Sequence, residues 1–177
     1  DGFCAAWVAQ RALGDIDAIA VIYGAPPPNV DERDVYLLDF SYPRPVMDEM
    51  KARARSLLVL DHHKTAQAVL AGLDYAVFDM ERSGAGIAWD HFFPDEPRHW
   101  LVDYVEDRDL WRNRLPESDE INAFISAMLF KYEVWQHEAR RTRGEAAAAG
   151  QWILKKTYQY VIEVKKNAVR VTYEGHD

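Results

Sequence analysis

Three residues that could do acid–base or metal chemistry, Asp61, His62 and His63, directly follow four consecutive apolar residues at 57–60. An apolar run of this kind is typical of a parallel-sheet strand that is buried on both faces. The polar residues then lie at the carboxyl end of that strand, where open α/β sheets bind ligands. Because adjacent side chains of a strand point to opposite faces, we expect one imidazole to face a metal ion and the other to face substrate or a hydrogen-bond partner. Taken alone, the three residues fit a solvated loop equally well.

Acidic residues elsewhere in the chain could complete a metal site with these histidines. Asp39 ends a second apolar run, and Asp1 lies at the start of an expected helix, where backbone N–H groups favour anions. A charged segment later in the chain offers Asp107, with Asp109 as its rival. The candidate ligands are therefore Asp1, Asp39, Asp61, His62, His63 and Asp107.

This mixture of carboxylates and imidazole indicates which ion to expect. Carboxylates with one imidazole suit Mn²⁺ or Mg²⁺, and the nitrogen ligand favours Mn²⁺. Carboxylates that converge without a cation repel one another and raise one another's pKa values. A pair of metal ions about 3.5–4 Å apart removes that repulsion, holds phosphoryl oxygens and can generate a hydroxide for in-line attack on phosphorus. The residues therefore indicate phosphoester chemistry at a two-Mn²⁺ site, with Mg²⁺ as the alternative ion.

Short strands and helices that alternate along the first half of the chain would position these residues. The expected strands are residues 16–23, 34–40, 56–60 and 75–78, and the expected helices are residues 2–13, 45–55, 65–71 and 83–93. Such alternation is typical of a parallel sheet with helices on its faces. We therefore predict an α/β fold with a largely parallel sheet flanked by helices.

The second half of the chain shows mainly helical patterns. Residues 100–105 and 120–129 are expected to be helices, and the charged segment 106–109 is expected to be a loop that neighbouring aromatic residues pack down. A helical pattern then runs from residue 133 to about 166 with an interruption at Gly150. A helix of that length is more often a connector between domains than a core element. The alternating pattern at 168–173 predicts the first strand of a further unit.

The composition excludes several classes of protein. The 177-residue chain is 49% hydrophobic and 28% charged, as ordinary globular domains are, and its formal net charge of −8 argues against non-specific capture of nucleic acid by a basic surface. No apolar run approaches the length of a membrane span, so no membrane partner is expected. The single cysteine, Cys4, cannot form an internal disulfide, which indicates a reducing compartment and a cytoplasmic location. We interpret Cys4 as a buried helix residue rather than a nucleophile.

In this order and spacing, the candidate residues resemble the motifs of the DHH phosphoesterase family. That family includes RecJ-type exonucleases, nanoRNases, cyclic-dinucleotide phosphodiesterases and family II pyrophosphatases. The matching segments are residues 1–6, 37–39, 61–63, 83–86 and 105–111. The resemblance covers roughly residues 1–115, and the long helix that follows is similar to the connector between the two domains of the family.

The resemblance implies a metal-binding role for four residues. Asp39 would bridge the two metal ions. The shell of the second ion would be completed by Asp1, His62 and Asp107. We prefer Asp107 to Asp109 because Asp107 keeps the family's spacing to an aromatic residue four positions later.

The resemblance also implies that His62, His63 and Asp61 are the catalytic residues. His63 would contact the scissile phosphate or hold the site by hydrogen bonding. Asp61 would orient an imidazole, as metal-bound histidines usually require. The glycine-rich turn at 83–86 would support the site or the helix that follows it.

The sequence departs from the family in two places. The family's first motif contains a histidine and two aspartates, and only its last two residues, Asp1-Gly2, are present here. The family's carboxy-terminal substrate domain is absent as well. We therefore expect a fragment that is weakly active or inactive. Its expected parts are a phosphoesterase domain at 1–130 that lacks its first strand, a connector helix at 131–166, and the start of a truncated substrate-binding domain at 167–177.

The expected function is hydrolysis of short oligonucleotides or cyclic nucleotides by a metal-dependent phosphodiesterase. One alternative is a phosphoanhydride hydrolase that acts on pyrophosphate or polyphosphate. The other is a non-catalytic module that binds a nucleotide or a protein. Four aromatic residues of the long helical pattern could stack bases: Trp135, Trp152, Tyr158 and Tyr160. More often such residues bury a connector helix against its neighbours or against a second subunit, so a homodimer is among the expected assemblies.

Overall fold

A parallel sheet lies at the centre of the first half of the chain. In the computed structural model, which describes residues 1–169, the three strands have the spatial order β1-β2-β3. They are β1 (Asp34–Leu38), β2 (Ser56–Asp61) and β3 (Ala76–Phe78). Both strand pairs are parallel, and the last paired residues of β1 and β2 are Leu38 and Leu60. The carboxyl ends of β1 and β2 therefore meet at one edge of the sheet.

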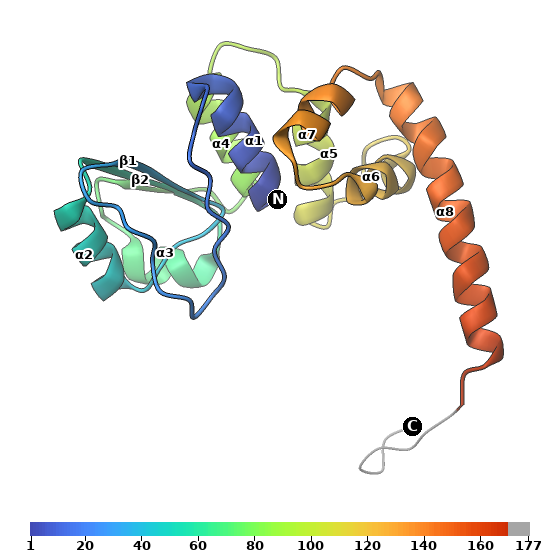
Figure 1. The fold of residues 1–177 in the computed structure, drawn as a ribbon, viewed down its shortest axis with the longest axis horizontal. Coiled ribbons are helices and arrows are strands. Elements are labelled where there is room, and N and C mark those ends of the chain that lie inside the picture. Colours follow the sequence, from blue (N-terminus) through green and yellow to red (C-terminus); the bar gives the residue numbers. More distant parts are fainter. Residues whose placement is uncertain (170–177) are drawn as a thin grey trace.

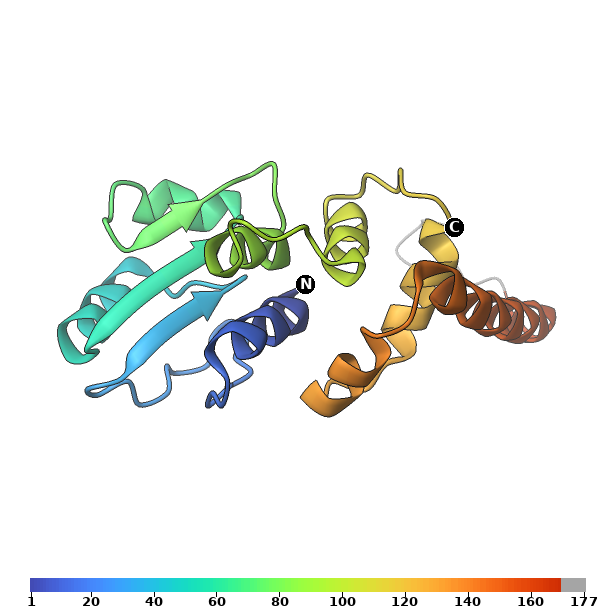
Figure 2. The same cartoon turned by 90° about the horizontal axis from the view of Figure 1, so that it is seen from above.

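The central strand β2 is buried from both sides, as its apolar run predicted. Leu57 and Val59 belong to one hydrophobic core, whereas Leu58 and Leu60 pack against the other. Consecutive residues of a strand point to opposite faces, so each face of the sheet must be covered. Helices cover both faces (Figures 1 and 2).

Four helices provide this cover. On one face, α2 (Arg44–Arg53) supplies Met47 and Met50 to the core, and α3 (Lys64–Leu70) supplies Leu70. On the other face, α1 (Gly2–Leu13) and α4 (Gly84–Phe92) pack against each other and against β1, and α4 also contacts β2.

The helices of the second half continue the α1–α4 side of the molecule. They are α5 (Trp100–Asp109), α6 (Ser118–Ala127), α7 (Tyr132–Glu138) and α8 (Arg143–Lys166). Helix α5 packs against α4 and α6, and the first half of α8 packs against α6. The second half of α8 projects away from the other helices (Figure 1). It carries exposed aromatic residues.

Most of the expected helices and strands are confirmed, but the strand expected at 16–23 is wrong. This segment forms no strand, and Ile19, Ile22 and Tyr23 in it are exposed. Its Ile and Val residues favour a strand, but β propensity mainly reflects packing against neighbouring strands. No strand among residues 1–169 pairs with this segment, so its β-favouring residues have no neighbouring strand to pack against.

Two expectations for the second half are also wrong. Residues 106–109 are not a loop but the last turn of α5. The long helical pattern is divided at 139–142 rather than at Gly150, and Thr142 and Glu145 form a capping box that starts α8. Gly150 lies inside α8. A Cβ at this position would overlap the backbone oxygen of Glu120 in α6, so only glycine fits there. The glycine thus marks a close helix contact, not a break.

The described residues establish an α/β fold with a small parallel sheet flanked by helices. The strand expected at 168–173 lies almost wholly outside them. Across residues 1–169, no helix combines the length and the apolar composition that crossing a membrane requires.

Candidate metal centre

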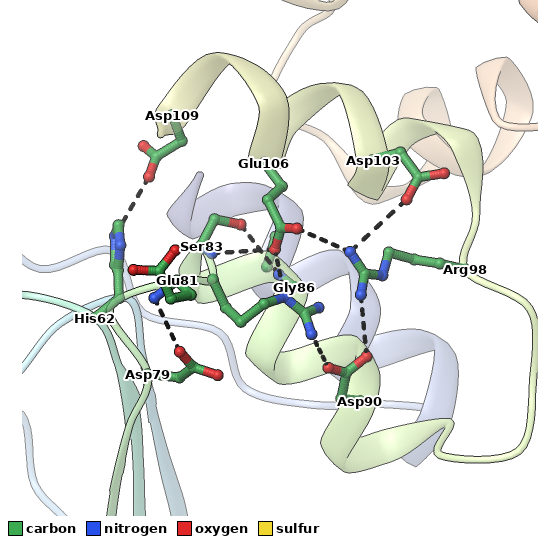
Figure 3. A network of polar contacts seen from close by, with 12 residues as sticks. His62, Asp79, Glu81, Ser83, Gly86, Asp90, Arg98, Asp103, Glu106 and Asp109 are labelled. Atoms are coloured by element: carbon green, nitrogen blue, oxygen red, sulfur yellow. Dashed lines mark hydrogen bonds and ion pairs between the residues drawn. The ribbon is translucent and has the colours of Figure 1, made fainter. Parts of the chain in front are cut away.

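Three carboxylates surround one nitrogen of His62 at the sheet edge. The Nε2 atom of His62 lies 3.2 Å from Oδ1 of Asp39, 3.4 Å from Oδ2 of Asp109 and 3.6 Å from Oδ2 of Asp1. Asp1 precedes α1, Asp39 follows β1, His62 follows β2, and Asp109 is the last residue of α5. Figure 3 shows Asp109 facing His62 across the space between α5 and the sheet. Segments far apart in the sequence thus place three acids around one imidazole.

The parallel sheet explains why Asp39 and His62 meet. Each follows its strand directly, and the strands end side by side. Asp39 has a left-handed backbone conformation with φ of 57°, and its N–H donates to the Leu60 oxygen at 2.9 Å. Aspartate tolerates this conformation better than most residues do. The turn brings its carboxylate back toward His62 instead of letting it continue along the strand.

The amino end of α4 holds Asp1 in place. The backbone N–H groups of Gly84 and Ala85 donate to the Asp1 carboxylate at 2.7 and 3.0 Å. The first N–H groups of a helix lack partners within the helix, and the helix dipole favours an anion there. A Cβ on Gly84 would lie 2.5 Å from the Cβ of Asp39, so only glycine allows this approach. Asp1 and Asp39 are thus both packed against the start of α4.

The pKa values of His62 and Asp109 are both raised in this site. The contact with Asp39 is the main cause that raises the pKa of His62; burial opposes it, and the Asp109 charge adds to it. Burial raises the pKa of the Asp109 carboxyl, the charge of His62 opposes this rise, and the charge of Asp39 adds to it.

The donor set and its spacing fit a divalent cation. Oδ1 of Asp39 and Oδ2 of Asp109 are buried and have no hydrogen-bond partner among residues 1–169. Ligand atoms of Asp1, His62 and Asp109 lie within 4.8 Å of one another, as do those of Asp39, His62 and His63. Around an ion with bonds of about 2.1 Å, neighbouring ligand atoms are separated by about 3.0–3.4 Å. The contacts of His62 with Asp39 and Asp109 have this spacing, and that with Asp1 is slightly longer.

His63 is oriented by a fully buried carboxylate. Nδ1 of His63 lies 2.7 Å from Oδ1 of Asp61, which also accepts the backbone N–H groups of His62 and His63. The other oxygen of Asp61 accepts the Ser41 hydroxyl at 2.8 Å. A carboxylate at this distance requires the proton on Nδ1, which leaves Nε2 of the partly exposed ring available to a ligand. Asp61 therefore contacts the ring of His63, and its expected role of orienting an imidazole stays a prediction.

Asp107 was preferred to Asp109 as the ligand, but in the structure it is Asp109 that faces His62. Asp107 is buried, and its carboxylate accepts the backbone N–H groups of Arg114 and Leu115 and the hydroxyl of Ser118. Two positions along a helix differ by about 200° in direction, so Asp107 and Asp109 cannot face the same site. Asp109 takes the place expected for Asp107, whereas Asp1, Asp39 and His62 come together as expected.

Glu106 is a supporting residue that the sequence analysis missed. Its buried carboxylate accepts the Ser83 N–H at 3.1 Å, Nε of Arg82 at 2.9 Å and Nη1 of Arg98 at 2.9 Å (Figure 3). A Cβ on Gly86 would overlap its Oε2 atom. Glu106 thus ties α5 to the 83–86 turn whose N–H groups hold Asp1. The signal in the sequence was its spacing of three residues from Asp109, which places both on one helix face.

Comparison with known proteins gives a likeness to a viral protein. The chain is 34% identical over 109 residues to the uncharacterized protein R106 of Acanthamoeba polyphaga mimivirus. The matched region is 60% of this chain and 26% of the viral protein, so the chain spans about a quarter of that relative. No family model matches the chain, and no solved structure matches it.

Proposed function

We propose that the chain carries the metal centre of a phosphoester hydrolase of the DHH type. The observation that supports this proposal most strongly is the convergence of Asp1, Asp39 and Asp109 on Nε2 of His62. Three carboxylates and one imidazole suit Mn²⁺ best, with Mg²⁺ as the alternative. The name of the viral relative states no activity, so the proposal depends on the site and on the motif resemblance.

The chain's own residues divide the work in this proposal. Asp1, His62 and Asp109 would hold the cation, and Asp39 belongs to a second group of ligand atoms, with His62 and His63, that shares the His62 imidazole. When bound, the cation would neutralise the carboxylates and supply Lewis acidity toward a phosphoryl oxygen. The buried N–H groups at the start of α4 and the Glu106 network would keep the ligands in place, because both fix the position of the 83–86 turn.

His63, held by Asp61, would act as a proton donor next to the cation. Asp61 holds the proton on Nδ1 of His63 and would stabilise the ring when Nε2 is protonated as well. From Nε2, His63 could contact a phosphate oxygen or donate a proton to the leaving oxygen of a phosphodiester. Asp61 acts only through His63, so it is a positioning residue.

Calorimetric titration of the chain with Mn²⁺ tests the metal centre. We expect saturable binding that His62→Ala weakens at least 100-fold while the far-ultraviolet circular dichroism stays unchanged. His137→Ala is the matched control, because this imidazole is exposed and belongs to no group of potential metal ligands among residues 1–169. Equal Mn²⁺ affinity of the wild type and the His62 variant would refute the proposal.

Hydrolysis of bis(p-nitrophenyl) phosphate by the Mn²⁺-loaded chain separates the alternatives. Turnover that His63→Ala abolishes supports a phosphodiesterase. Turnover of pyrophosphate alone supports the phosphoanhydride hydrolase. Mn²⁺ binding without hydrolysis of either compound fits both an inactive fragment of the enzyme and the non-catalytic nucleotide- or protein-binding module.

A further inference from the structure

Tyr23 is an exposed tyrosine whose ring packs against the metal centre. Its ring centroid lies 6.4 Å from that of His63, with an angle of 80° between the rings, and 4.8 Å from that of Phe40, which directly follows Asp39. The residue is nonetheless 69% exposed. Tyrosine combines an apolar ring with a polar tip, so a ring that packs on the site and stays open to solvent can present its hydroxyl to a ligand.

A glycine turn helps to hold the tyrosine in this position. The Ala25 N–H donates to the Ile22 oxygen at 3.1 Å, and Gly24 has a φ of 86°. A positive φ at the third residue of a turn is unfavourable for most side chains but not for glycine. Tyr23 is the second residue of this turn. The turn and the packing on Phe40, rather than strand pairing, therefore position Tyr23 beside the site.

The phenolic oxygen of Tyr23 lies within electrostatic reach of carboxylates of the site. Partial burial raises the pKa of Tyr23, and the charges of Asp61 and Asp39 raise it further. These charges act on the phenolic oxygen, because that atom becomes negative when the group ionises. The phenol therefore keeps its proton at neutral pH and can donate a hydrogen bond. Within residues 1–169, the side-chain contacts of Tyr23 are made by its ring, which leaves the hydroxyl free to donate.

The proposed reaction favours a neutral hydrogen-bond donor at this place. A phosphoryl group brings negative oxygens toward a site that already contains the carboxylates of Asp1, Asp39 and Asp109. A bound cation offsets part of this repulsion. A neutral donor stabilises a further phosphoryl oxygen without adding a positive charge that would compete with the cation for the carboxylates. Tyr23, next to His63, is placed to be such a donor.

We infer that the Tyr23 hydroxyl donates a hydrogen bond to a phosphoryl oxygen of the substrate, while the cation binds another oxygen of the same group. This inference rests on the proposed function and adds to it a residue that binds the substrate. A hydrogen bond to a charged group changes affinity by roughly 10- to 150-fold. The exposure of Tyr23 favours the lower end of this range, because water competes for the hydroxyl.

Calorimetric titration of the Mn²⁺-loaded chain with methylphosphonate tests this inference. The probe carries phosphoryl oxygens, has no ester bond to hydrolyse and has no ring that could stack. Tyr23→Phe removes only the hydroxyl, and we expect it to weaken methylphosphonate binding about tenfold while Mn²⁺ affinity stays unchanged. Tyr23→Leu, which also removes the ring, should weaken binding by a similar factor. Tyr160→Phe is the matched control, because Tyr160 on α8 is 65% exposed and should leave the affinity for the probe unchanged.

The outcomes distinguish this inference from the proposed function. Intact Mn²⁺ binding with equal methylphosphonate affinity in the wild type and the Tyr23→Phe variant would overturn the role of the hydroxyl and leave the metal centre standing. This holds even if Tyr23→Leu loses affinity, since the ring alone would then account for the loss. A wild type that does not bind methylphosphonate would also overturn the inference. Binding that depends on the Tyr23 hydroxyl but occurs in a chain that takes up no Mn²⁺ would overturn the proposed function and support the contact with the phosphoryl oxygen.

Discussion

The candidate metal centre is built from two regions that position their side chains in different ways. At the sheet edge, Asp39 and His62 follow adjacent parallel strands, so chain direction alone brings them together. In the helical region, Asp109 reaches the site because it lies on the side of α5 that is turned toward His62. The position of a residue at a strand end is enough to predict that its side chain lies at the sheet edge. For a residue in a helix, the rotation of the helix about its axis must also be known.

This difference explains which ligands could be recognised from the sequence. The apolar runs before Asp39 and His62 identify strand ends without further knowledge. Asp107 and Asp109 lie in the same charged stretch, and the choice between them depends on whether that stretch is helical and how it is rotated. Figure 3 shows the consequence, since Glu106 and Asp109 leave α5 on the side of α4 and the sheet.

The sharpest test of this comparison is to replace Asp109 by asparagine. Loss of a charged ligand should weaken Mn²⁺ binding at least 100-fold, which corresponds to about 2.7 kcal/mol. The raised pKa of Asp109 means that its charge is unfavourable in the folded chain without metal, so the free energy of unfolding should stay constant or increase. Calorimetric titration and urea unfolding measure the two effects. Unchanged Mn²⁺ affinity would show that Asp109 is not a ligand of the ion, although α5 turns it toward His62.

The converse change, Asp107→Asn, should act on stability instead. An amide offers one acceptor oxygen, and its NH₂ group would face the N–H donors of Arg114 and Leu115. Leaving these partly buried donors poorly paired should lower the free energy of unfolding by about 2–3 kcal/mol. Mn²⁺ affinity should fall far less than in the Asp109 variant. Urea unfolding is the measurement, and a variant as stable as the wild type that no longer binds Mn²⁺ would restore Asp107 as the ligand.

Much of the fold followed from local patterns, and the errors have physical causes. The strands at 34–38, 56–61 and 76–78 were recognisable because each is short, apolar and bounded by polar residues. The segment at 16–23 has a similar composition but pairs with no strand among the described residues, and no local pattern reports the presence of a partner. Gly150 looked like a helix break because glycine is a poor helix former, whereas its role is to allow contact with α6.

Gly150 gives a third test, which probes packing in the helical region alone. Gly150→Ala should lower the free energy of unfolding by about 2 kcal/mol because the methyl group would collide with the backbone of Glu120. Gly144→Ala in the same helix is the control: it meets no atom within 4 Å and should raise stability by about 0.5 kcal/mol. Thermal or urea unfolding compares the two variants. A stabilising effect at both positions would show that α6 and α8 do not approach as closely as described.

The smallest expected effect is a pH dependence of stability that comes from His99, a histidine of the helical region. Nδ1 of His99 accepts the Leu101 N–H at 3.2 Å, and Nε2 lies 3.1 Å from the Ala139 oxygen. One neutral tautomer, with its proton on Nε2, satisfies both contacts. Burial lowers the pKa of His99; the contact with Ala139 opposes this shift, and the charge of Arg11 adds to it. Protonation would remove the acceptor that caps α5.

The sign of the resulting pH dependence follows from this lowered pKa. Above about pH 6.5 the imidazole is neutral in both the folded and the unfolded chain. Below that pH the unfolded chain takes up a proton that the folded chain resists, so the free energy of unfolding falls as the pH decreases toward the folded pKa. Urea unfolding at pH 7.5 and 5.5 should show a loss that is larger in the wild type than in His99→Asn by up to about 1 kcal/mol, the contribution of one hydrogen bond. Asparagine keeps an oxygen that can cap the helix but does not titrate. His137→Asn should behave like the wild type, and an equal loss in the wild type and the His99 variant would show that protonation of His99 does not lower the free energy of unfolding in this pH range.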